Sequence, residues 1–292
     1  MAEPNETLAV FSAALADTVT AAAPSVVSIR SARTRSSGFV WRPGLIVTAD
    51  DALPDDGDLT VVPTIGDPLP ARVAGRDPTT DTALLRIERA DLPVVTMATS
   101  AVRSGEVALA LGAEDGAATV ALGVVARVAG PWRSLRGGEI DARIELGLDL
   151  RRSAEGGVVL NAFGQATGMP VFGPRGRVII IPASTIDRVA QRLERDGRVA
   201  RGYVGLGLQT VAVDGDKSGA MVISVDPEGP AVAAGIRQGD ILLAWNGEPV
   251  PNVQSLLRAL GPESVGQSVR LELSRAGDTM SLSLTVAEKP VT

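Results

Sequence analysis

Short apolar runs separated by glycine, proline and polar residues fill most of the first 180 positions of the chain. Each run is rich in Val, Leu, Ile or Ala. They are Ser25 to Ser31, Gly38 to Trp41, Leu45 to Ala49, Leu59 to Pro63, Ala83 to Ile87, Glu106 to Leu111 and Thr119 to Val128. Short runs bounded by turn residues at this spacing are typical of an all-β barrel or sandwich. We therefore expect this region to be mainly β.

The hydrophobic pattern changes near Ile181. Over 183–196 the apolar positions follow helical spacing, and Gly197 stands where a helix is expected to end. Strands resume after Gly202, with two further helical pieces at 230–234 and 253–260. The pattern thus predicts an N-terminal helical segment over 1–23, a β domain over 24–200 and a second, α+β domain over 201–292.

The N-terminal segment is apolar from Leu8 to Ala23 but lacks the positive residues that open a signal peptide. It begins with Glu3 and Glu6 and carries Asp17 within the apolar run. No uninterrupted apolar stretch of about 18 residues occurs, so we expect no membrane span. We expect a cytoplasmic protein, or a periplasmic one if the chain is a mature form cut from a longer precursor.

Composition excludes several kinds of chemistry. The net charge of -6 argues against binding to nucleic acid, which needs a basic surface. The chain has no cysteine and no histidine, and its only lysines are Lys217 and Lys289. A thiolate nucleophile, a disulfide framework and a cysteine-bound zinc ion are therefore excluded, and a serine–lysine dyad is not expected. No cofactor is predicted.

The C-terminal domain carries a specific motif, GPAVAAGIRQGDILLAWNGEPV over 229–250, in which Asn246-Gly247 forms a turn between two apolar runs. This stretch resembles a PDZ domain. The resemblance implies a loop that binds a peptide's C-terminal carboxylate, formed by Tyr203, Val204, Gly205 and Leu206. It also implies a groove helix over 253–260. Val253, Leu256 and Leu257 are its candidate peptide-binding residues, although these side chains and Leu260 could face either the ligand or the core.

The preceding region is similar to the HtrA (DegP-like) family of bacterial serine proteases. The segments APSVVSI over 23–29, SGFV over 37–40 and RDPTTDTALL over 76–85 carry the resemblance, as does the junction over 198–206. Membership would imply a trypsin-like double β-barrel followed by a PDZ domain. It would place Asp81 in the role of the catalytic aspartate.

The sequence departs from the family pattern at the catalytic positions. Asp51 stands where the family has histidine, and Glu155 stands in place of the nucleophilic serine. The residues before Glu155 are Arg152 and Ser153 at family positions for proline and glycine, so we expect this loop to follow a different path. Ser153 is out of register and lacks a base, and it is not expected to replace the nucleophile.

Three carboxylates held close together repel one another, so one or more should be protonated or paired. In one interpretation, an arginine such as Arg151 or Arg152 neutralises the three acids, which are Asp51, Asp81 and Glu155. In a second, the carboxylates bind an oxygen-liganded cation such as Ca²⁺ or Mg²⁺. In a third, a pair of them performs acid–base catalysis.

These observations favour a catalytically inactive pseudoprotease that is not an enzyme. It would bind a peptide or a protein C-terminus through its PDZ domain as an adaptor, a scaffold or a chaperone-like factor. The alternatives are a residual hydrolase or metal-binding protein that uses the acidic residues, and a structural subunit of a larger assembly. Such an assembly would be a homotrimer or a hetero-complex, with the N-terminal segment and its Phe11 between protomers.

Overall fold

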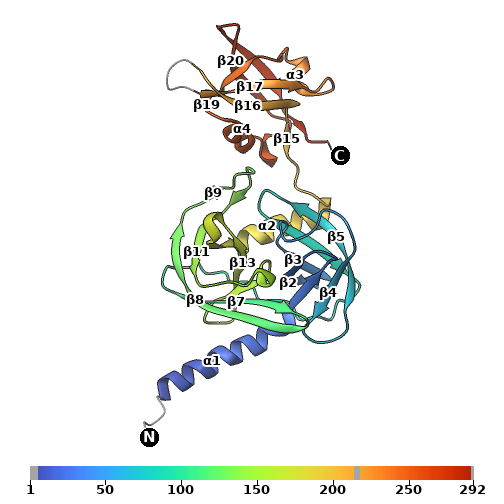
Figure 1. Ribbon diagram of the computed structural model, residues 1–292, viewed down its shortest axis with the longest axis vertical. Coiled ribbons are helices and arrows are strands. Elements are labelled where there is room, and N and C mark those ends of the chain that lie inside the picture. The colour runs from blue at the N-terminus through green and yellow to red at the C-terminus, as the bar shows by residue number, and fades with distance from the viewer. Residues whose placement is uncertain (1–5, 214–217, 291–292) are drawn as a thin grey trace. The chain divides into compact units, whose positions relative to one another are not determined.

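The computed structural model describes residues 6–213 and 218–290, which form two compact units (Figure 1). The first unit runs to Trp132 and resumes over Glu139–Arg198. The second comprises Arg133–Gly138 and the chain from Val199 onward. The division between Arg198 and Val199 lies two residues before the boundary expected from the sequence.

A closed antiparallel barrel forms the first half of the first unit. Its strands are β1 (Val26–Arg30), β2 (Arg35–Arg42), β3 (Leu45–Thr48), β4 (Leu59–Pro63), β5 (Leu69–Asp77) and β6 (Thr82–Ile87). They are hydrogen-bonded in the order β1-β2-β3-β6-β5-β4. Alternate side chains such as Val27, Ile29 and Leu85 fill the interior, as the two-residue period of a strand requires.

A second closed barrel follows. Its strands are β7 (Val107–Glu114), β8 (Ala117–Ala129), β11 (Arg143–Gly147), β12 (Val158–Leu160), β13 (Ala166–Phe172) and β14 (Val178–Pro182), in the order β11-β14-β13-β12-β7-β8. Two short strands, β9 (Trp132–Arg133) and β10 (Glu139–Ile140), lie between β8 and β11 in the chain. The predicted double β-barrel is confirmed.

Two α-helices flank the barrels in the sequence. Helix α2 (Ala183–Asp196) confirms the helical spacing, and it ends at Gly197, whose φ of 71° is the left-handed geometry typical of a helix stop. Helix α1 (Glu6–Ala22) leads through a short 3₁₀ turn, Ala23–Ser25, into β1. None of its side chains is buried. Residues 1–5 of the predicted N-terminal segment lie outside the described residues.

The N-terminal helix bears on the expectation that the chain has no membrane span. Among the described residues, the stretch Glu6–Ser25 is long and apolar enough to cross a membrane by length and composition. Glu6 and Asp17 are too few charges to lower its mean hydropathy below that of a spanning segment. A signal sequence satisfies the same criteria, and so does a core helix of a soluble protein, although α1 is not buried.

The second unit is an open sheet with helices. Its elements are β15 (Gly202–Tyr203), β16 (Leu206–Ala212), β17 (Ser218–Val225), α3 (Pro230–Ala233), β18 (Ile241–Trp245), β19 (Glu248–Pro249), α4 (Val253–Ala259), β20 (Ser268–Arg275), β21 (Asp278–Thr285) and β22 (Ala287–Glu288). The main sheet runs β16-β17-β18-β20-β21, and β19 pairs with β18. The expected turn at Asn246-Gly247 joins β18 to β19, and both residues have positive φ.

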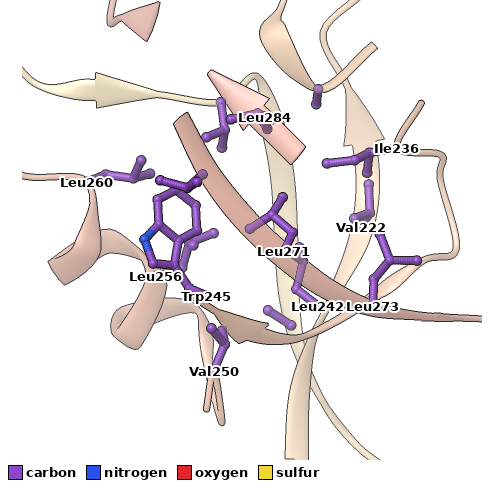
Figure 2. Packing of buried hydrophobic residues seen from close by; sticks show 14 of the residues in the cluster. Val222, Ile236, Leu242, Trp245, Val250, Leu256, Leu260, Leu271, Leu273 and Leu284 are labelled. Carbon is purple, nitrogen blue, oxygen red and sulfur yellow. The ribbon is translucent and has the colours of Figure 1, made fainter. Parts of the chain in front are cut away.

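The core of this unit lies between the sheet and helix α4. Trp245, Leu242 and Leu271 pack there with side chains from the other strands, and Leu256 reaches it from α4 (Figure 2). Because the helix contributes a buried leucine, its position beside the sheet is fixed by apolar packing.

Candidate functional sites

Asp81 lies on the turn between β5 and β6. Its φ of 53° is left-handed, a conformation that Asp and Asn tolerate better than most residues. The turn is held by the buried Asp77, whose carboxylate accepts hydrogen bonds from Thr79 and Thr80. The backbone of the turn thus fixes where the Asp81 carboxylate can point.

Asp51 follows β3 and meets Asp81 through its backbone. The N–H of Asp51 donates to Oδ1 of Asp81 at 2.8 Å, while the Asp51 side chain is exposed. The neighbouring Asp50 is buried, with 4% of its surface exposed, and it forms an ion pair with Arg76. The structure therefore brings Asp51 and Asp81 together, as the sequence predicted.

Glu155 reaches the site from the second barrel. It follows a 3₁₀ turn over Arg152–Ala154, and its Oε1 accepts the backbone N–H of Phe172, the last residue of β13, at 3.0 Å. The next residue, Gly156, has a φ of 81°, and a Cβ there would lie 2.5 Å from the carbonyl oxygen of Ser37. Glycine is therefore required for the loop to pass this point.

The three acids influence one another electrostatically. Burial raises the pKa of Asp81 to about 7; the charges of Asp51, Glu155 and Asp50 act in the same direction, and the Asp51 N–H opposes them. Burial also raises the pKa of Glu155, opposed by the Phe172 N–H and by Arg152. Asp81 is therefore partly protonated at neutral pH, chiefly because it is buried, and the repulsion between like charges acts in the same direction.

The two arginines expected near the acids lie in different places. The Arg152 guanidinium lies 5.1 Å from the centroid of the Phe172 ring and lowers the pKa of Glu155 by its charge. Arg151 instead lies 3.5 Å from the Glu114 carboxylate. Among the described residues, no three acidic side chains are arranged to hold a metal ion. The cation-binding interpretation thus gains no support from the geometry.

The backbone of the loop before Glu155 is engaged in local hydrogen bonds. The N–H of Glu155 donates within the 3₁₀ turn to the carbonyl of Arg152 at 3.2 Å. The carbonyl of Ser153 accepts a hydrogen bond from the Ser37 hydroxyl at 2.6 Å. Its own hydroxyl faces Glu114 at 3.5 Å. In this geometry the Glu155 N–H is engaged within the turn, and the acceptor beside the Ser153 hydroxyl is a carboxylate rather than an imidazole.

The predicted carboxylate-binding loop lies between β15 and β16. The carbonyl of Val204 accepts the N–H of Ala231 at 3.0 Å, and that of Gly205 accepts the N–H of Asp226 at 2.8 Å. Within the hydrogen bonds of the described residues, the N–H groups of Val204 and Gly205 are not donors. Gly205 has a φ of 75°, and a Cβ there would lie 2.9 Å from Gly229 Cα.

Two further residues complete the loop. The Tyr203 hydroxyl donates to Oδ2 of Asp226 at 2.5 Å, so this side chain is engaged in a contact below the loop. Leu206 is the first residue of β16, the end strand of the main sheet, and its half-buried side chain packs on the core. The backbone of the loop, more than its side chains, is therefore available to a ligand.

Helix α4 lies beside β16, and the Val253 N–H donates to the Thr210 hydroxyl of that strand at 3.2 Å. Val253 is half-buried, and Leu257 is 39% exposed. Leu256, proposed as a binding residue, is only 1% exposed and packs in the core, as does Leu260. The sequence prediction for Leu256 is corrected, because residues one position apart on a helix face different directions.

Sequence reasoning missed three residues that shape the acidic site: Asp50, Arg76 and Phe172. Asp50 directly follows the apolar run Leu45 to Ala49, and Arg76 opens the segment 76–85. A charged residue at the end of an apolar strand pattern is the signal that could have drawn attention to them. Phe172 contributes a backbone N–H, for which no sequence signal exists.

Comparisons with known proteins agree with this architecture. Residues 36–169 match the model of the trypsin-like peptidase domain, and residues 204–286 match that of the PDZ domain. A probable periplasmic serine endoprotease, DegP-like, from Brucella suis is 31% identical over 274 residues, covering 88% of this chain and 53% of the relative. The Rhizobium meliloti relative of the same name is 29% identical, with coverage of 88% and 54%. The chain thus spans about half the length of the curated relatives it matches.

Solved structures give the same result. The serine endoprotease from Yersinia pestis has a TM-score of 0.72 and 28% identity, and the match covers 94% of this chain and 98% of that one. The HtrA-type protease AlgW with a decapeptide has a TM-score of 0.71, with coverage of 95% and 99%. At 22% identity, AlgW shows the fold alone.

The prediction that this chain is not an enzyme is contradicted by these relatives. The Brucella suis and Rhizobium meliloti proteins and the Yersinia pestis structure are all named serine endoproteases. The inference from the histidine count was too strong for a physical reason. The absence of histidine closes the imidazole route to hydrolysis, but a carboxyl whose pKa lies near 7 can also give or take a proton at neutral pH.

Replacing Asp81 by Asn should stabilise the protein at high pH. With its pKa raised to about 7 in the folded state, Asp81 binds a proton that the unfolded chain has already lost, so its contribution to stability falls as pH rises from about 4 to above 7. Asn keeps the left-handed turn and the acceptor for the Asp51 N–H. Urea denaturation should show a gain on the order of 1–3 kcal/mol at about pH 8.5 and much less at about pH 4. An equal effect at both pH values would contradict a raised Asp81 pKa.

The two family matches follow one another along the chain in the order that the strands and helices show. Two closed six-stranded barrels precede an open sheet with its helices. The chain therefore carries a trypsin-like peptidase domain followed by a PDZ domain, the domain order of the HtrA and DegP-like serine proteases.

Proposed function

We propose that the chain captures extended or C-terminal segments of partner proteins through its PDZ domain and holds them as an adaptor or chaperone-like factor. The observation that carries this proposal is the position of β16. It is the end strand of its sheet, paired with β17 on one side, and helix α4 lies beside it.

The chemistry of the strand edge supports this proposal. An added peptide strand can form main-chain hydrogen bonds with the unpaired edge of β16, while alternate side chains reach Leu257 and Val253 of α4. At the start of the strand, the N–H groups of Val204 and Gly205 can donate to a terminal carboxylate. A hydrogen bond to a charged acceptor is stronger than one between neutral groups, so a free C-terminus should be preferred.

Peptides with a free C-terminal carboxylate should bind at least about 10-fold more tightly than the same peptides with a C-terminal amide, a difference of about 1.4 kcal/mol. Fluorescence anisotropy with an array of apolar C-terminal peptides measures this ratio. Leu257→Asp should weaken binding by a similar factor, because it places a charge beside the apolar ligand side chain.

A matched control is Leu122→Asp, at another exposed leucine in the peptidase domain. It should leave peptide affinity unchanged. Equal affinity for peptides with a C-terminal carboxylate and with a C-terminal amide would count against capture at this edge. So would an unchanged peptide affinity in Leu257→Asp.

A second candidate function is hydrolysis by carboxylates, favoured by the pKa of about 7 at Asp81 beside the exposed Asp51. The serine–histidine route needs an imidazole, and the sequence contains no histidine. In this proposal the ionised Glu155 takes a proton from the attacking water, and the protonated Asp81 gives one to the leaving amine.

Cleavage of an unstructured protein such as casein should decline above about pH 7, because Asp81 then loses the proton it must donate. Asp81→Asn and Glu155→Gln should each reduce the rate by at least about 100-fold, the usual contribution of a general acid or base. Asp55→Asn, at an exposed acid elsewhere, and Ser153→Ala should retain it. A rate that survives in Asp81→Asn and Glu155→Gln but is lost in Ser153→Ala would exclude this mechanism.

We also propose a periplasmic location, in place of the cytoplasm expected from the sequence. The Brucella suis and Rhizobium meliloti relatives are named periplasmic, and α1 has the length and apolar composition of an export signal. In cell fractionation the protein should be released with periplasmic proteins, or retained on the outer face of the inner membrane. Recovery in the cytoplasmic fraction alone would contradict this location. The homotrimeric assembly expected from the sequence remains a prediction.

A further inference from the structure

Asp51 belongs to a largely exposed segment of the surface. From Asp51 to Asp58 most side chains are exposed or half-buried, and Leu53 is the one buried side chain. A short turn, in which the Leu53 N–H donates to the Asp50 carbonyl at 3.1 Å, gives only local order. The position of the Asp51 N–H opposite the Asp81 carboxylate therefore also depends on how the backbone of this exposed segment is held.

Arg76, on β5, makes that contact with three hydrogen bonds. Its Nε donates to Oδ1 of Asp50 at 2.5 Å, one terminal nitrogen donates to the Asp50 carbonyl at 3.0 Å, and the other donates to the Pro54 carbonyl at 2.9 Å. The bonds reach both ends of the segment 50–54, which carries Asp51. A planar guanidinium can bind these acceptors simultaneously, whereas an ammonium group offers no such fixed fork.

The backbone that carries Arg76 is itself fixed on two sides. Arg76 pairs with Ala83 of β6, and it forms a parallel bridge with Arg198. The adjacent Gly75 lies so close to Gly197 that a Cβ at position 75 would be 2.6 Å from the Gly197 carbonyl oxygen. The guanidinium therefore extends from a strand that is fixed on two sides to a largely exposed segment.

Burial strengthens the dependence of Asp50 on its ion pair with Arg76. Asp50 is almost fully buried, and the Arg76 side chain is 24% exposed, so the pair is largely removed from water. A buried carboxylate without its cation is strongly unfavourable. The burial that raises the pKa of Asp50 is opposed chiefly by Arg76.

We propose that Arg76 is a positioning residue that holds the Asp51 N–H against the Asp81 carboxylate by clamping the segment 50–54. The inference deepens the proposed carboxylate chemistry and rests on it, because it assigns the residue that sets the geometry of the acidic site. Arg76 acts through Asp50 and Pro54 and touches neither reacting carboxylate. The charged groups that face Asp81 are Asp51, Glu155 and Asp50.

The test measures the hydrogen bond directly by NMR, without any assay of cleavage. In the wild-type protein the amide proton of Asp51 should shift with pH as Asp81 ionises, with a midpoint near 7. Between about pH 5 and 9 the acceptor changes from largely neutral to fully charged. In Arg76→Gln this shift should fall to less than about half, because a hydrogen bond weakens steeply once its alignment is lost. Asp81 itself should still titrate, with a pKa above the wild-type value, since the N–H that lowers it is removed.

Arg76→Lys keeps the charge but not the fork, and it should restore less than the full shift. Arg72→Gln, at an exposed arginine on the same strand, should behave as wild type. If Arg76→Gln fails to fold because Asp50 is left unpaired, the double variant Asp50→Asn with Arg76→Gln removes both buried charges and should show the same loss.

A full Asp51 amide shift in either folded variant overturns the positioning role. So does complete restoration by lysine, which would make the charge alone sufficient. A wild-type protein that shows the titration but cleaves nothing would refute the proposed hydrolysis and leave the role of Arg76 intact.

Discussion

Closure of the two barrels determines which groups of this chain, side chain or backbone, can meet a ligand in each domain. In a closed barrel every strand has a neighbour on both sides over most of its length, so backbone hydrogen-bonding groups are largely consumed by the sheet. Side chains that meet a ligand must then come from turns, as Asp81, Asp51 and Glu155 do. The PDZ sheet is open instead, and β16 can offer its backbone. One chain thereby combines a candidate site made of side chains with a candidate site made of main chain.

The acidic site shows how burial and charge act together. Desolvation is the largest influence on the pKa of Asp81, and neighbouring carboxylates add to it, while a single backbone N–H opposes both. Burial also raises the pKa of Glu155, which is less deeply buried, and the Phe172 N–H and the charge of Arg152 oppose it. Burial thus raises the pKa of both carboxyl groups, while the charges of their neighbours differ.

The sequence predicted the architecture well because patterns with a local cause specify it. Alternating apolar runs gave the strands, the spacing of Ile186 and Val189 gave helix α2, and Asn246-Gly247 gave the hairpin. The acidic site was only partly predictable. Motif register located Asp51, Asp81 and Glu155, whereas the Phe172 N–H and the Arg76 clamp arise from strands that meet only in the folded chain. Leu256 was misassigned because helical spacing alone does not say which leucine faces the sheet. The conclusion about activity failed for a different reason, since a missing residue type excludes one mechanism and not a class of protein.

The Glu155 carboxylate accepts the Phe172 N–H and so occupies a hydrogen-bond donor at the end of β13. An N–H at the end of a strand is a natural partner for the carbonyl of an incoming extended chain. Here a carboxylate from the same molecule already occupies it, at an effective concentration on the order of millimolar or more, as for other intramolecular partners. A peptide that pairs with this end of β13 must therefore either displace Glu155 or bind elsewhere along the strand. The side chain in the nucleophile position thus also limits which segments can lie beside it.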